Sequence, residues 1–158
     1  MKQISAILLF VCSTPLAAME PMECAQTLDK ARPNWEIVEA QQWLISAVTR
    51  SGENPYVTTG DFDSDENTDV AFLIRGEDPA KPMIAVCLTT KDPEVAIIKD
   101  LYCRDGIVTV RKGTEYYNFD TDETARYNAD GIHAYCYAKA GATYQYDKGD
   151  FRMIVDSD

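Results

Sequence analysis

The sequence has only one histidine, and none of its cysteines forms a close Cys-x-x-Cys pair. Because zinc sites are usually assembled from cysteine and histidine ligands at such short spacings, a zinc site is not expected. Basic residues are also scarce, with 15 Lys and Arg against 26 Asp and Glu and a net charge of −11. Nucleic acids and anionic membrane surfaces would repel this chain, so neither is expected as a partner.

Long apolar runs are absent as well. The first run, residues 4–12, is far shorter than the roughly 18 residues that a membrane-spanning helix needs, and no later run approaches that length. No membrane span is therefore expected. Lys2 precedes the run, Pro15 ends it and Ala17-Ala18 follows. This is the pattern of a signal peptide cleaved after Ala18.

We therefore expect residues 1–18 to be removed on export, and residues 19–158 to form a single domain in the periplasm or outside the cell. A lipoprotein anchored through Cys12 is the alternative, although Val11 stands where lipidation signals place a small residue. Removing residues 1–18 takes away one basic and no acidic residue, which leaves a net charge of −12. This acidity would attract a basic protein partner, or would simply keep an exported protein soluble.

Four cysteines remain after the expected cleavage, namely Cys24, Cys87, Cys103 and Cys136. An even number in a chain bound for an oxidising compartment predicts two disulfides. Three pairings are possible, and the sequence does not decide among them. The short separation of Cys87 and Cys103, on segments that could be adjacent strands, favours that pair and leaves Cys24 with Cys136.

Helical spacing of apolar residues predicts a helix over 24–31 and another over 36–50, although residues 35–38 could equally begin as a strand. Beyond residue 55, short runs of β-branched and aromatic residues alternate with turn residues, which is typical of strands. The expected strands cover residues 56–59, 70–75, 83–89, 95–102, 107–111, 132–139, 143–147 and 151–155. Residues 144–151 read as a hairpin with Lys148 and Gly149 in its turn.

No long helical segments separate these runs, which favours antiparallel over parallel pairing. The alternation of Ile84, Val86 and Leu88 supplies one buried face. The sequence thus predicts an α+β fold in which an N-terminal helix packs on a mainly antiparallel β-sheet, with disulfides stabilising the domain.

The segment 60–71 carries the most specific pattern of the chain. Counting from Asp61, carboxylates fall at the first, third, fifth and ninth positions, just before an apolar strand. Calcium is held by oxygen ligands, and a curled loop with acids at alternate residues turns them towards one centre. The expected ligands are the side chains of Asp61, Asp63, Asp65 and Asp69 and the backbone carbonyl of Asn67.

This segment, with Gly60-Asp61-Phe62 before it, resembles the calcium loops of FG-GAP and related repeats. The family pattern has Gly at the sixth position, for a backbone with positive φ, where this chain has Glu66, and Phe72 replaces the twelfth-position Glu of an EF-hand. The alternative to a calcium site is a degenerate loop that keeps the turn without the ion. Through this loop and the order of its neighbouring segments, the chain is similar to exported proteins of proteobacteria that carry a single such loop. Similar loops occur in periplasmic immunity proteins that block cell-wall-degrading enzymes, so the resemblance implies a function of that kind.

Catalytic patterns are weaker. No nucleophile-elbow glycine pattern accompanies any serine, and Asp120 with Asp122 is a carboxylate pair of a kind that arises by chance in so acidic a chain. His133, Tyr135 and Tyr137 alternate on one face of an expected strand. We expect a non-enzymatic exported binding protein, an inhibitor or immunity protein against a basic cell-wall-degrading enzyme. The alternatives are a small periplasmic hydrolase and a structural envelope protein.

Overall fold

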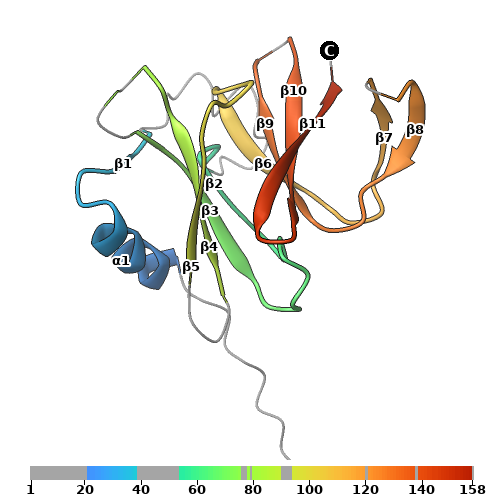
Figure 1. The fold of residues 1–158 in the computed structure, drawn as a ribbon. Helices are drawn as coiled ribbons and strands as arrows, with labels where there is room; N and C mark the ends of the chain where they lie inside the picture. The colour runs from blue at the N-terminus through green and yellow to red at the C-terminus, as the bar shows by residue number, and fades with distance from the viewer. Residues whose placement is uncertain are drawn as a thin grey trace, which may run out of the picture.

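The structure is a computed structural model that describes residues 21–38, 54–75, 78, 80–89, 94–119, 121–137 and 139–157. These residues form one short helix and eleven strands, all paired antiparallel, so the fold is mostly β (Figure 1). The antiparallel pairing expected from the sequence is confirmed, whereas the helical share of an α+β fold is smaller than expected. The expected signal peptide, residues 1–18, lies outside the described residues.

The first sheet has five strands in the order β1-β3-β4-β5, and β2 also pairs with β3. Its strands are β1 (Glu36–Ile37), β2 (Val57–Gly60), β3 (Asp69–Arg75), β4 (Met83–Leu88) and β5 (Glu94–Ile98). Strands β3 and β4 are buried on both faces. The helix α1 (Pro21–Ala31) covers one face with Cys24 and Leu28, and the second sheet covers the other. This double burial explains the continuous apolar runs in these two strands.

The second sheet has the order β11-β10-β9-β6. Its strands are β6 (Gly106–Val110), β9 (Gly131–Tyr135), β10 (Gly141–Asp147) and β11 (Asp150–Ser157). The predicted β10–β11 hairpin is confirmed, since Lys148 and Gly149 have φ of 53° and 98°, the positive values that a type I′ turn requires. A separate hairpin of β7 (Glu115–Asn118) and β8 (Glu123–Arg126) was not predicted, because its strands are polar and lack an apolar alternation.

The two sheets share one apolar core. Phe62, Leu73 and Val86 from the side of the first sheet pack in the same cluster as Ile132 and Tyr144 from the second. The sheets also meet at β2 and β6, where the Thr109 hydroxyl donates to the Thr59 carbonyl at 2.7 Å. Because the core spans both sheets, their relative position is set by side-chain packing as well as by hydrogen bonds.

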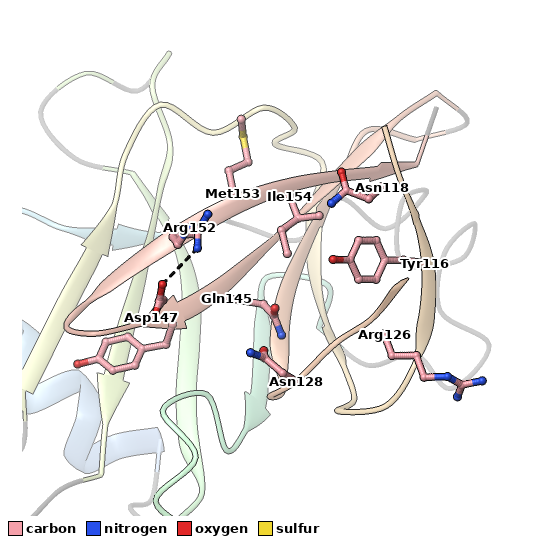
Figure 2. A pocket seen from close by; sticks show the side chains of 10 residues that line it. Tyr116, Asn118, Arg126, Asn128, Gln145, Asp147, Arg152, Met153 and Ile154 are labelled. Carbon is pink, nitrogen blue, oxygen red and sulfur yellow. Dashed lines mark hydrogen bonds and ion pairs between the residues drawn. The ribbon is translucent and has the colours of Figure 1, made fainter. Parts of the chain in front are cut away.

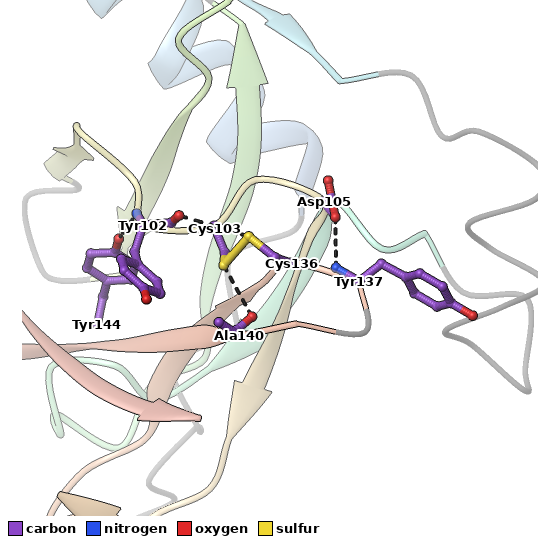
Figure 3. Close-up of a disulfide and its surroundings, with 7 residues drawn as sticks. All are labelled: Tyr102, Cys103, Asp105, Cys136, Tyr137, Ala140 and Tyr144. Atoms are coloured by element: carbon purple, nitrogen blue, oxygen red, sulfur yellow. Dashed lines mark hydrogen bonds between the residues drawn. A yellow bond between two sulfur atoms is a disulfide. The ribbon is translucent and has the colours of Figure 1, made fainter. Parts of the chain in front are cut away.

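Two disulfides are present, Cys24–Cys87 and Cys103–Cys136, so the pairing favoured by the sequence is wrong. Cys87 points to the face of β4 that α1 covers and packs there with Cys24. Cys103 instead lies on the connection from the first sheet to the second, beside Cys136 at the end of β9 (Figure 3). Nearness in sequence was misleading because Cys87 packs against the helix, whereas Cys103 lies beside Cys136.

Other predictions need correction at their boundaries. The helix expected over 36–50 is wrong at its start, where Glu36 and Ile37 pair with β3 as a strand, and residues 39–50 lie outside the described residues. The strand expected over 95–102 ends at Ile98, and that expected over 132–139 ends at Tyr135. Beyond Ile98, Leu101 is buried by tertiary packing and Cys103 is buried with its disulfide. The apolar character of these two residues therefore does not mark a strand.

Candidate functional site

The acidic loop, residues 61–68, connects β2 to β3 and draws three carboxylates together. One oxygen each of Asp61, Asp63 and Asp65 lies within 4.8 Å of the others. Backbone amides hold this arrangement, since Asp65 N donates to Asp61 at 3.0 Å and Asn67 N donates to Asp65 at 2.8 Å. The predicted convergence of these three side chains is therefore confirmed, and it comes from turns that the aspartates themselves cap.

The backbone of the acidic loop follows the predicted conformation at its sixth position. Glu66 has φ of 70°, and Ser64 has φ of 65°. A residue other than glycine in this left-handed region costs about 1 to 2 kcal/mol. The bonds from the Glu66 and Asp65 amides to Asp61 offset part of this cost.

Asp69 lies apart from this carboxylate group. It is fully buried, its Oδ2 accepts the Phe62 amide at 2.8 Å, and its Oδ1 accepts the Thr89 amide at 2.8 Å. Burial raises the pKa of Asp69 to about 6, although the two hydrogen bonds lower it. The nearby charges of Asp63 and Asp65 also raise this pKa. The side chain expected to close a calcium cage thus joins the base of the loop to the end of β4. The carbonyl of Asn67 stays a predicted ligand.

The chemistry of the group suits a hard cation. Each carboxylate offers two oxygens with several lone pairs, and calcium takes oxygen ligands. Burial, followed by the nearby charge of Asp65 and also that of Asp61, raises the pKa of Asp63. A bound cation would relieve this repulsion. The three carboxylates could therefore hold a metal ion.

Asp130, which the sequence analysis missed, fixes the acidic loop to the second sheet. Its carboxylate accepts the Lys112 amide at 2.9 Å and the Asp61 amide at 3.3 Å, and it pairs with Arg111 at 2.7 Å. Burial alone would raise the pKa of Asp130, but these bonds outweigh it and hold the pKa below its ordinary value. No local pattern marks this residue, because its partners come from two distant segments.

A polar cleft of about 360 Å³ lies between the β7–β8 hairpin and the β10–β11 hairpin (Figure 2). Its charged groups are already paired, with Arg152 at 3.2 Å from Asp147 and Arg126 at 2.9 Å from Glu115, which stands beside the cleft. The other lining residues are mainly amides, aromatic rings and apolar side chains: Tyr116, Asn118, Asn128, Gln145, Tyr146, Met153 and Ile154. The sequence analysis missed this cleft because its walls come from separate strands.

His133 belongs to a hydrogen-bonded network beneath the β7–β8 hairpin. Its Nδ1 lies 3.0 Å from the Thr143 hydroxyl and 3.3 Å from Asp156, whose other oxygen accepts bonds from Tyr127 and Thr143. Burial would raise the pKa of Asp156, but the bonds from His133, Thr143 and Tyr127 together lower it. Tyr116 of β7 stacks on Tyr127 with ring centroids 4.3 Å apart. The network therefore ties one wall of the cleft to the sheet.

The remaining described residues singled out from the sequence lie at the end of β9 and on the β7–β8 hairpin. Tyr137 lies beyond the end of β9, so it does not share a strand face with His133. Asp120 lies outside the described residues, and Asp122 accepts a hydrogen bond from Tyr117 on the β7–β8 hairpin.

In the described part of the chain, no helix has the length and apolar character that crossing a membrane requires. Two disulfides are compatible with a location outside the cytoplasm. No protein-family model, no curated protein and no solved structure matches the chain.

Proposed function

We propose that this chain is an extracytoplasmic binding protein that holds an extended segment of a protein partner in the polar cleft. The observation that carries this proposal is that two of the strands that line the cleft, β7 and β11, each have an edge to which no described strand is paired. Among the described residues, β11 pairs only with β10 and β7 pairs only with β8. An unpaired edge presents free N–H and C=O groups, and an extended peptide can add to it as a further strand.

The side chains of the cleft support this kind of ligand. Asn128 and Gln145 carry amide groups, which both donate and accept, as peptide groups do. The arginines are offset by neighbouring carboxylates, so the cleft is close to neutral within a strongly acidic chain. A peptide backbone, polar and uncharged, suits such a surface. The acidic remainder of the protein would speed the approach of a basic partner.

Binding is favoured over catalysis because the buried acids already have structural bonds. Asp69 holds two backbone amides, Asp130 fixes the acidic loop, and Asp156 binds Tyr127 and Thr143. A general acid or base needs instead to reach a substrate. Together with the resemblance to periplasmic immunity proteins, these structural bonds support the proposal that the protein inhibits an exported, basic cell-wall-degrading enzyme.

Filling the cleft should abolish partner capture. We expect Asn128→Trp to reduce recovery of a partner from periplasmic extract at least tenfold, because the indole would occupy the space of the peptide, and we expect recovery to fall at high salt. Thr124→Trp, on exposed β8, is the matched control and should capture normally. Quantitative mass spectrometry of the captured proteins measures the effect. Equal recovery by both variants would contradict the role of the cleft.

We further propose that Asp61, Asp63 and Asp65 bind calcium, with a dissociation constant of about 0.1 to 1 mM, as in extracellular modules. At 1 mM calcium and a dissociation constant near 0.1 mM, binding would stabilise the fold by about 1.4 kcal/mol. Thermal unfolding in calcium and in chelator should therefore differ by several degrees.

The doubly substituted Asp63→Asn/Asp65→Asn protein should lose this difference. Glu123→Gln/Glu115→Gln, which removes the same charge from the exposed β7–β8 hairpin, should retain it. If millimolar calcium left the melting temperature of the unsubstituted protein unchanged, the acidic loop would be a turn that binds no calcium.

A further inference from the structure

A second, smaller pocket gathers basic side chains where the first sheet connects to the second. It has a volume of about 180 Å³ and is formed by residues 81–83, at the start of β4, and by the segment that connects β5 to β6. Lys81, Lys99 and Arg104 line it, with Asp100 as its single acidic residue. We call it the basic pocket. It shares no residue with the polar cleft.

No salt bridge within the described residues neutralises the three cations of the basic pocket. Within the described part of the chain, neither lysine nor Arg104 forms an ion pair, and Asp100 has none either. Arg104 Nη1 donates to the Ala80 carbonyl at 2.7 Å, which holds the guanidinium in place without compensating its charge. The pocket therefore has a net charge of about +2 in a chain whose net charge is −11.

The floor of the basic pocket strengthens its attraction for an anion. Leu101 is 5% exposed, and Pro82 and Met83 are partly buried, so apolar groups back the three charges. Charges beside an apolar wall are screened less than charges in open water. A guanidinium binds carboxylate or phosphate through two parallel bonds, and lysine ammonium groups bind the same oxygens as point charges.

We propose that the basic pocket binds a small oxyanion, a carboxylate or phosphate group, either free or as the end group of a larger ligand. Its volume admits such a head group, and its charge selects for it. The proposal stands independently of the function assigned to the polar cleft, because the two sites share no residue.

Titration of the 15N-labelled protein with inorganic phosphate and with acetate, at constant ionic strength, tests the proposal. We expect saturable amide shifts confined to Lys81, Met83 and residues 99–104, with dissociation constants in the millimolar range for the tighter anion. The Lys81→Gln/Lys99→Gln variant should bind at least tenfold more weakly. Lys112→Gln/Lys148→Gln makes the same change in net charge at exposed positions elsewhere and should bind within twofold of the unsubstituted protein.

Methyl phosphate distinguishes the two sources of the anion. Binding equal to that of phosphate supports an end-group ligand, and weaker binding supports a free ion. Arg104→Gln gives a second, independent variant whose amide spectrum reports whether the fold is intact. Shifts that rise without saturation and spread over all surface lysines, equally in both double variants, would overturn the proposal.

Discussion

Replacing Cys24 and Cys87 together with alanine is expected to lower the free energy of unfolding by about 4 kcal/mol. The disulfide joins residues 63 positions apart, so it removes much of the freedom of the unfolded chain. In a domain whose total stability is of the order of 5 to 15 kcal/mol, this is a large fraction. Chemical denaturation followed by far-UV circular dichroism measures the change.

The loss should be concentrated at α1, because the disulfide joins this helix directly to β4. Cys24 and Leu28 are its two buried side chains among the described residues, and they pack against Val70, Phe72 and Ala85 of the first sheet. Hydrogen exchange should therefore show α1 opening well before β3 and β4 in the variant.

The Cys103→Ala/Cys136→Ala variant is the matched control. Its disulfide closes a separation of 33 residues, for which the same model gives a loss of about 3.7 kcal/mol, and exchange at α1 should stay slow. Peptide mapping without reduction checks the pairing directly. A fragment that links Cys87 to Cys103 would contradict the structure and restore the pairing that sequence spacing favours.

The strands were predictable where local chemistry decides them. The β10–β11 hairpin follows from alternating aromatic residues around Lys148 and Gly149, and β3 and β4 follow from apolar runs that are buried on both faces. The β7–β8 hairpin was missed because its strands are polar and lack an apolar alternation. Its link to the second sheet runs through Tyr127, which stacks on Tyr116 and donates a hydrogen bond to the distant Asp156. Similarly, disulfide pairing depends on which face of β4 the helix covers, and spacing along the chain does not contain that information.

The candidate site was predictable only where residues close in sequence form it. Alternate aspartates in a tight turn do converge, so Asp61, Asp63 and Asp65 could be found by spacing alone. The polar cleft and the basic pocket could not, since each combines side chains from segments that meet only in the folded chain. Asp69 shows the limit most clearly, because its position in the motif indicates a ligand whereas its burial gives it a structural role.

Asp69→Ala is expected to destabilise the protein by about 2 to 4 kcal/mol, whether or not calcium is present. The substitution leaves the Phe62 and Thr89 amides without their acceptor, and Phe62 and Thr89 are both buried. Each buried donor left unpaired costs about 1 to 3 kcal/mol, and part of this is returned because the buried carboxylate no longer has to be desolvated.

Two further variants separate this structural role from cation binding. Asp69→Asn keeps one acceptor oxygen but presents an N–H group to the other backbone amide. Its loss of stability should therefore lie between zero and the loss caused by Asp69→Ala. Asp63→Asn, at a partly buried position of the acidic loop, should leave stability in chelator unchanged or slightly raised, because it removes one of three mutually repelling charges. Denaturant unfolding in chelator ranks the three. If Asp69→Ala were harmless in chelator but abolished stabilisation by calcium, Asp69 would be a ligand after all, and the acidic loop would have to rearrange around the ion to bring its carboxylate in.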